Sequence, residues 1–145
     1  MKKSKGFTLI ELMVVIVILG ILAAVIAPRI PQFVNKAKEG KTKGNLGTLR
    51  STLNIYYSDN DGVYPTDTLS CLTPKYIKQI PDAEMPPTHV ASNAVAADGS
   101  GDGGLTPADA GGWIYENTRT ESNWGDIGVN CNAHTDSNGN YWSSY

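Results

Sequence analysis

The longest apolar run of the chain lies close to its N-terminus. Every residue from Leu12 to Ala27 is apolar or glycine, and Phe7, Leu9 and Ile10 extend the run in the N-terminal direction. At about 1.5 Å per residue, a helix over residues 7–27 is just long enough to cross a hydrocarbon core about 30 Å thick. The pattern therefore predicts one transmembrane helix over residues 7–27.

A weaker helical segment is predicted over residues 28–58. Pro28 and Pro31 each remove a backbone N–H donor and disfavour the helical conformation of the residue before them, so a kink or a melted stretch is expected there. Three glycines follow, and each costs about 1 kcal/mol inside a helix, which extends the expected weak zone to residue 47. These glycines are Gly40, Gly44 and Gly47.

Beyond the prolines, leucines recur at intervals of three and four residues. Leu46, Leu49 and Leu53 form one apolar stripe on a helix, and Tyr56 or Tyr57 continues it. We expect the stripe to pack against the chain's own C-terminal head rather than against a partner. The helix should end at the sequence SDNDG, because Asp and Asn favour caps and glycine readily adopts a positive φ.

The remaining residues, 59–145, are expected to form a globular head. Residues 85–112 are rich in Pro, Ala, Gly, Ser and Asp and lack apolar periodicity, which predicts a long surface loop. Residues 113–116 and 126–130 resemble short strands, and residues 141–142 are candidates for an edge strand. The prediction is an α+β fold: a long N-terminal helix with a small head built on a short antiparallel sheet.

The charges constrain the environment of each end of the chain. The chain has 12 Lys and Arg against 14 Asp and Glu, so no basic excess indicates a nucleic-acid partner. The first six residues, MKKSKG, carry three lysines, so the positive-inside rule predicts a cytoplasmic N-terminus and an exported head. Signal cleavage after Ala27 is disfavoured because Pro28 follows directly, and an uncleaved signal anchor is the simplest alternative.

One carboxylate interrupts the apolar run. Glu11 lies near its start, and an ionised carboxylate facing lipid is costly. An anchor with no other task should not carry such a residue, which predicts that Glu11 has a partner. The alternative is that its side chain extends to the lipid head groups.

The stretch KGFTLIELMVVIVILGILAAVIAP, residues 5–28, resembles the N-terminal signature of type IV pilins and of the pseudopilins of type II secretion. The resemblance implies that prepilin peptidase removes a leader of residues 1–6 by cutting between Gly6 and Phe7, and methylates the new N-terminus at Phe7. It also implies that Glu11 of an incoming subunit attracts the Phe7 amine of the preceding subunit and so sets the register of a filament.

From this resemblance we expect a structural subunit of a helical, homo-oligomeric type IV pilus-like filament. The subunit would lie in the inner membrane before assembly, contact the bilayer and the inner-membrane assembly machinery, and end in an extracellular or periplasmic filament. One alternative is a major pseudopilin of a type II secretion system, which acts as a piston in protein export. A second alternative is an uncleaved, signal-anchored envelope domain that binds a ligand or partner.

The chain has two cysteines, Cys71 and Cys131, and both lie in the predicted exported part. A disulfide between them would close a long loop and contribute about 4 kcal/mol in the chain-entropy model. Two unpaired buried thiols are the competing interpretation. Many pilins carry a disulfide in the head, so the resemblance favours the bond.

Weak calcium candidates occur near the C-terminus. Asp126, and Asp136 and Asn138 within the sequence DSNGN, could supply oxygen ligands, but neither segment matches a complete calcium loop. An Asx-rich turn is the simpler interpretation. We therefore predict no cofactor, with calcium as the alternative.

The sequence shows no catalytic motif. His89 and His134 each stand in a polar loop without metal-ligand spacing, and no nucleophile elbow is present. We expect both histidines to be isolated surface residues. The chain is therefore predicted not to be an enzyme.

Overall fold

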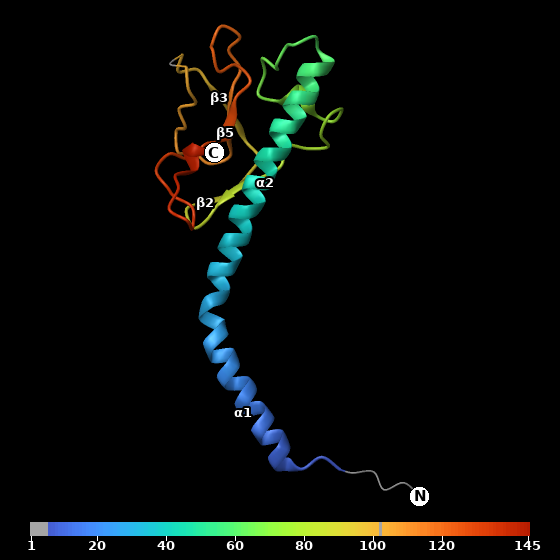
Figure 1. Cartoon of the computed structure of the whole chain (residues 1–145), viewed down its shortest axis with the longest axis vertical. Coiled ribbons are helices and arrows are strands. Elements are labelled where there is room, and N and C mark those ends of the chain that lie inside the picture. Colours follow the sequence, from blue (N-terminus) through green and yellow to red (C-terminus); the bar gives the residue numbers. More distant parts are fainter. Residues whose placement is uncertain (1–5, 102) are drawn as a thin grey trace, which may run out of the picture. The chain divides into compact units, whose positions relative to one another are not determined.

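The structure is a computed structural model that describes residues 6–101 and 103–145. The chain divides into two compact units, a first unit that ends at Val34 and a second unit formed by Asn35–Tyr145. Figure 1 shows helices in the N-terminal part and short strands in the C-terminal part, which together make an α+β protein. The predicted leader lies outside the described residues except for Gly6.

The predicted apolar helix is present as α1, which spans Leu9–Ile26. A 3₁₀ turn, η1, follows at Ala27–Arg29 and places Pro28 at the start of a helical turn, where its missing N–H costs little. The helix α2 then runs over Ile30–Asp59, so the predicted break at Pro28 is a change of helix type. Residues 30–47 are helical in this structure, and melting of this stretch inside a filament stays a prediction.

The second half of α2 carries the core of the second unit. Leu46, Leu49 and Leu53 are at most 3% exposed, which confirms the predicted stripe and its packing on the chain's own head. Tyr56, rather than Tyr57, continues the stripe against the core. The helix ends at Asp59, within the predicted SDNDG sequence.

Two small sheets complete the head. The first pairs β1 (Ala83–Met85) with β2 (His89–Ser92) in antiparallel orientation. The second has the order β3-β4-β5, formed by Val95–Asp98, Trp113–Glu116 and Ile127–Val129. Two short 3₁₀ helices, η2 and η3, lie at Ser70–Leu72 and Trp142–Ser144.

The prediction of a wholly antiparallel sheet is wrong in one respect. The strand β4 is antiparallel to β5, as expected, but it is parallel to β3, with Val95 opposite Trp113 and Asp98 opposite Glu116. The strands β2 and β3 both lie within residues 85–112, which were predicted to be a loop. These short segments are strands because their backbones pair with neighbouring strands. Their sequences show no alternation of apolar and polar residues, so the strands could not be predicted from them.

The predicted edge strand at residues 141–142 is also absent. Tyr141 forms only an isolated bridge with Thr135, and Trp142 begins η3. The Trp142 side chain is fully buried in the core. Only Trp142 of this aromatic pair is buried, from a helical turn rather than a strand, whereas Tyr141 is 57% exposed.

Gly112, just before β4, lies very close to Ala94, the last residue between β2 and β3. Its φ is +75°, and a Cβ there would lie 2.5 Å from the carbonyl oxygen of Ala94. That same oxygen accepts a hydrogen bond from Trp113 N at 2.8 Å. A side chain at Gly112 would therefore disturb the start of the parallel β3–β4 pair.

We expect Gly112→Ala to lower the free energy of unfolding by about 2 kcal/mol or more, because the left-handed conformation costs alanine roughly 1–2 kcal/mol before any clash is counted. Denaturant unfolding of the full chain in detergent measures the change. Gly99→Ala is the matched control, since Gly99 has no atom within 4 Å of the added Cβ. Equal stability of the two variants would contradict this account.

Candidate functional site: the N-terminal helix and the polar clusters of the head

The predicted cleavage residues lie immediately before α1. Gly6 and Phe7 are exposed and outside regular secondary structure, and the helix begins at Leu9. A peptide bond in this position is sterically open to another molecule. The geometry fits the predicted processing site, although cleavage itself stays a prediction here.

Glu11 is held by the residue that caps α1. The Thr8 side chain accepts a hydrogen bond from Glu11 N at 3.3 Å, and Thr8 N donates to Glu11 Oε2 at 2.9 Å. The Thr8 hydroxyl also donates to that oxygen, at 2.6 Å. This is a capping box, and the sequence TLIE at residues 8–11 is the signal that predicts it. Glu11 therefore has a local partner in the single chain, which sequence reasoning missed.

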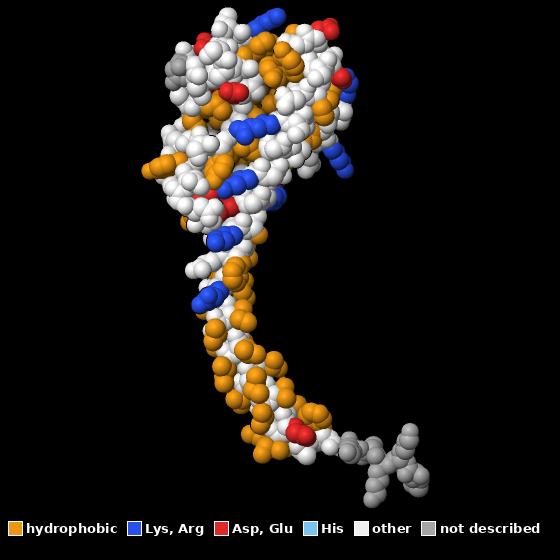
Figure 2. Space-filling model, in the orientation of Figure 1, with side chains coloured by type: hydrophobic (Ala, Val, Ile, Leu, Met, Phe, Trp, Pro, Cys, Tyr) orange, Lys and Arg blue, Asp and Glu red, His pale blue; other side chains and the backbone are white. Residues whose placement is uncertain are grey.

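The apolar side chains of α1 are exposed in the part of the chain that the structure describes. Every residue of α1 is exposed, and apolar side chains cover the helix in Figure 2. The helical segment Leu9–Asp59 contains a stretch with a mean hydropathy of 3.1 that is long and apolar enough to cross a membrane. In water such a surface would be strongly unfavourable, so α1 requires lipid or neighbouring apolar helices around it.

The DSNGN turn is built around a buried carboxylate. Asp136 Oδ2 lies 2.6 Å from Lys43 Nζ and accepts a hydrogen bond from Tyr145 Oη at 2.7 Å. Its other oxygen accepts from the backbone N–H groups of Asn138 and Asn140, both at 2.9 Å. Although burial opposes it, this set of donors lowers the pKa of Asp136 well below its usual range. Lys43 thus already supplies the positive charge at this turn.

The other calcium candidates are solvent-exposed. Asp126 and Asn138 both lie on the surface. Within residues 6–101 and 103–145, neither Asp126 nor Asp136 belongs to a group of three or more His, Cys, Asp or Glu side chains that could share an ion. Calcium binding stays a prediction without a shared acidic site to support it.

The predicted disulfide is not formed in the structure. Cys71 and Cys131 are both free; Cys71 is exposed and Cys131 is buried. Cys71 lies in η2, where its N–H donates to Asp67 Oδ2 at 2.9 Å. Cys131 instead lies beside His134, with Sγ 3.5 Å from Nδ1. The spacing along the chain allowed a bond, but the fold gives each thiol different neighbours.

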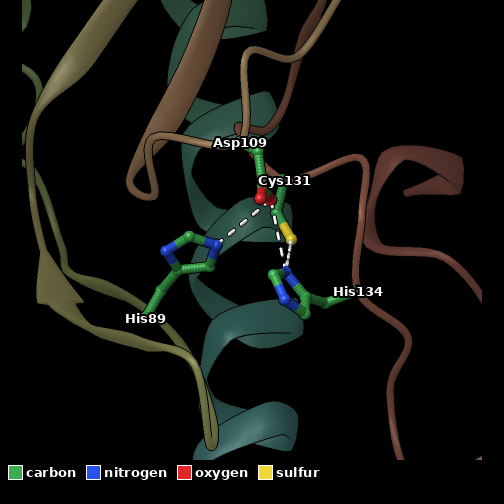
Figure 3. A group of neighbouring side chains, drawn as sticks. All are labelled: His89, Asp109, Cys131 and His134. Carbon is green, nitrogen blue, oxygen red and sulfur yellow. Dashed lines mark hydrogen bonds and ion pairs between the residues drawn. The ribbon is translucent and has the colours of Figure 1, made fainter.

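The prediction of two isolated surface histidines is also wrong. His89 Nε2 and His134 Nδ1 lie 3.2 Å and 3.3 Å from the same oxygen, Oδ1 of Asp109. Cys131 completes the group, and one ligand atom from each of the four residues lies within 4.8 Å of the others. Figure 3 shows the four side chains pointing toward one another. We call this group the His₂CysAsp cluster.

The cluster is electrostatically coupled. Burial, followed by the nearby Asp109 carboxylate, raises the pKa of the Cys131 thiol to about 11. The hydrogen bond from Cys131, opposed by desolvation and assisted by His89 and His134, lowers the pKa of Asp109 to about 2. At neutral pH the cluster therefore contains one carboxylate and one thiol.

Only one part of this cluster has a sequence signal. Cys131 and His134 are separated by only two residues, which keeps a thiol and an imidazole close together, although this pair alone is not a complete metal-ligand pattern. His89 and Asp109 lie far away in the chain and show no pattern of their own. The pairing of strands and the loop before β4 bring them together, so the sequence alone could not reveal the complete set.

The chain matches a known family motif and is similar in part to known proteins. The Prokaryotic N-terminal methylation motif matches residues 1–27. The chain is 46% identical over 66 residues to the type II secretion system core protein G of Vibrio cholerae, which is 46% of this chain and 44% of that protein. It is 44% identical over 59 residues to the protein of the same name in Pseudomonas aeruginosa, 41% of this chain and 42% of that protein.

A type IV pilin is also similar to part of the chain. The type IV major pilin protein PilA of Myxococcus xanthus is 41% identical over 59 residues, 41% of this chain and 27% of that protein. The chain spans less than half the length of these relatives. No solved structure matches the chain. Residues 1–27 thus carry the prokaryotic N-terminal methylation motif, and part of the chain is similar to type II secretion system core protein G and to a type IV major pilin.

Proposed function

We propose that the chain is a structural subunit of a type IV pilus-like filament. The observation that carries this proposal is α1: a fully exposed apolar helix that begins with the prepilin-type motif and has a carboxylate in its first turn. Such a helix needs lipid before assembly and apolar neighbours afterwards, and identical helices packed in a bundle supply the second environment. The function is packing rather than catalysis.

Processing would prepare the helix for assembly. Prepilin peptidase would cut the exposed Gly6–Phe7 bond on the cytoplasmic side, and methylation would follow at Phe7. The cut removes the lysines of the leader, which otherwise hold the N-terminus at the cytoplasmic face. It also creates an ammonium group close to Glu11, so that each subunit carries both members of a charge pair.

Localisation follows from the same steps. Before assembly the subunit would span the inner membrane once, with the N-terminus in the cytoplasm and the head exported. Inner-membrane assembly machinery would then transfer α1 from lipid to the filament, which ends outside the cell or in the periplasm. Prepilin peptidase, that machinery and further copies of the chain are the partners this route requires.

A major pseudopilin of a type II secretion system is the second candidate. The observation that favours it is that four bacterial proteins named type II secretion system core protein G, from Pseudomonas, Vibrio, Klebsiella and Dickeya, are similar to part of the chain. The two candidates differ in outcome when the gene is deleted. Loss of surface filaments with normal secretion indicates a pilin, whereas loss of protein secretion without loss of surface filaments indicates a pseudopilin.

Intact mass spectrometry of the native protein tests the proposed processing. We expect a mass that lacks residues 1–6 and carries one methyl group, because the motif places both modifications at the Gly6–Phe7 bond. We expect the same mass before and after reduction, since both cysteines are free. An uncut, unmethylated chain would contradict the proposal and favour a signal-anchored envelope domain.

A further inference from the structure

We propose that the His₂CysAsp cluster of the head is a zinc-binding site, in which His89, Asp109, Cys131 and His134 supply one ligand atom each. The proposal concerns the second unit alone and goes beyond the filament function. It rests on the spacing of the ligand atoms, the way the fold holds them, and their chemical type.

The spacing is that of a tetrahedral metal site. Ligand atoms at the usual distances of about 2.0–2.3 Å from zinc lie about 3.3–3.6 Å apart along the edges of the tetrahedron. In the cluster, Asp109 Oδ1 lies 3.2 Å from His89 Nε2 and 3.3 Å from His134 Nδ1, and Cys131 Sγ lies 3.5 Å from His134 Nδ1. Three edges therefore already have the length that zinc requires.

The remaining pairs need only a small movement. All four ligand atoms lie within 4.8 Å of one another, so the longest separation must close by about 1 Å to reach the zinc geometry. The side chain of His134 is 35% exposed and has room to rotate. The two imidazole rings are nearly perpendicular, at 83°, so each can direct a nitrogen to a common centre.

The fold fixes the backbone around the cluster. The loop before β4 is fastened to the segment after β5 by three hydrogen bonds: Ala108 N to Asn130 Oδ1 at 2.7 Å, Gly111 N to Asn130 O at 2.9 Å, and Asn132 Nδ2 to Pro107 O at 2.7 Å. Asn130 is buried. Asp109 and Cys131 are thus held beside each other before any ion arrives.

Asp109 itself has an unusual backbone conformation. Its φ is +58°, a left-handed value that is uncommon for a residue other than glycine. Aspartate tolerates it better than most residues. In this conformation the Asp109 carboxylate reaches both histidines. His89 belongs to another element, as the first residue of β2.

The ligand types favour zinc over calcium or magnesium. A thiolate and two imidazoles are ligands that zinc prefers, whereas calcium takes oxygen ligands. One thiolate and one carboxylate carry two negative charges, which balance the two positive charges of the ion when both histidines are neutral. The Cys131 side chain is fully buried and those of the other ligands are partly exposed, which leaves a path for entry.

Binding would exchange a proton for the metal. The S–H bond of Cys131 breaks, a Zn–S bond forms, and that proton leaves to solvent. The ring proton of each histidine moves, through solvent, from the nitrogen that faces Asp109 to the other ring nitrogen, so that His89 Nε2 and His134 Nδ1 each present a lone pair to zinc, and the ionised Asp109 binds through a carboxylate oxygen. No oxidation or reduction takes place. The ion would connect β2, the loop before β4 and the segment after β5, and would therefore stabilise the native head.

Cobalt(II) is the probe for the first test, because tetrahedral cobalt absorbs visible light strongly and a thiolate adds a charge-transfer band. The full chain, purified reduced and metal-free in detergent, is titrated with cobalt and then with zinc. We expect one ion per chain, a tetrahedral spectrum with the thiolate band, displacement of cobalt by zinc, and a higher melting temperature with zinc bound.

Variants identify the ligands. Losing a residue that only orients a metal ligand typically weakens metal binding 10–100-fold. Losing a ligand itself costs more, so we expect Cys131→Ser and His134→Ala each to weaken zinc binding by about 100-fold or more. Cys131→Ser should also abolish the thiolate band. Cys71→Ser is the matched control and should bind as the unchanged chain does, because Cys71 lies outside the cluster. Partly exposed His134 provides a ligand variant if Cys131→Ser fails to fold.

Three results would overturn the proposal. The first is an octahedral cobalt spectrum without the thiolate band. The second is equal zinc affinity of His134→Ala and the unchanged chain. The third is a native Cys71–Cys131 disulfide, seen as a mass gain on reduction, because the same sulfur cannot serve both roles. None of these results depends on whether the chain forms a filament.

Discussion

Replacing Glu11 by glutamine is expected to reduce filament assembly about tenfold or more while leaving the start of α1 intact. Glutamine can accept the hydrogen bonds that Thr8 N and the Thr8 hydroxyl donate to Glu11, and glutamine is itself a normal member of a capping box. What the substitution removes is the charge that would pair with the Phe7 ammonium of another subunit. A neutral side chain also enters the membrane more easily, so poor insertion would not explain a loss of filaments.

The measurement is the amount of filament per cell by electron microscopy and by shearing, with the amount of processed subunit in the membrane as reference. We expect about a tenfold or larger loss of filaments at an unchanged amount of subunit, since about 1.4 kcal/mol of assembly free energy changes an equilibrium tenfold. Normal filament abundance in Glu11→Gln would show that the charge does not direct assembly.

Thr8→Ala is the matched control, because it removes the helix cap and keeps the charge, whereas Glu11→Gln keeps the cap and removes the charge. It removes the hydroxyl that caps α1 and contacts Glu11, but it keeps the carboxylate. Assembly should continue if charge pairing is the essential term. If Thr8→Ala loses filaments and Glu11→Gln keeps them, the role of Glu11 is to begin the helix, and the pairing account is wrong.

Replacing Leu49 by alanine is expected to cause a large loss of head stability. Leu49 is fully buried in the centre of the stripe on α2, among the core side chains of the head. Removing a buried leucine side chain forfeits its transfer free energy and leaves a cavity, which together cost about 3 kcal/mol. For a unit of this size we expect a fall in melting temperature of roughly 10 °C or more.

Unfolding of the full chain in detergent, followed by tryptophan fluorescence, measures this loss. The three tryptophans, Trp113, Trp124 and Trp142, all lie in the head and report its unfolding. Ile55→Ala on the same helix is the control. Ile55 is 57% exposed, so its truncation should change the free energy of unfolding by less than about 0.5 kcal/mol. Equal effects of the two substitutions would show that the stripe does not carry the core.

Features with a local period were predictable from the sequence. The apolar run before Pro28, the three-and-four spacing of Leu46, Leu49 and Leu53, and the end of α2 at Asp59 all agree with the structure. The buried face also extends one turn toward the N-terminus through polar residues. Thr42 both donates to Glu84 O and accepts from Glu84 N, at 2.8 Å each, and no apolar pattern marks it.

Features that depend on distant parts of the chain were not predictable in this way. The strand β3 exists because β4 pairs with it, and four residues without an apolar alternation do not indicate that pairing. Cysteine count and export suggested a disulfide, but Cys131 lies among His89, Asp109 and His134 rather than beside Cys71. The histidines were assigned to isolated positions because their neighbours in space are far away in sequence.

By itself, the sequence determined the membrane-type helix, its motif and the amphipathic helix that follows, because helix geometry turns residue spacing directly into faces. Only the tertiary structure decided the parallel strand pair, the separation of the two cysteines and the assembly of the His₂CysAsp cluster. These features depend on which loops the strands bring together. The arrangement of strands and loops depends on burial and hydrogen bonding across the whole head, and no local periodicity of the sequence predicts it.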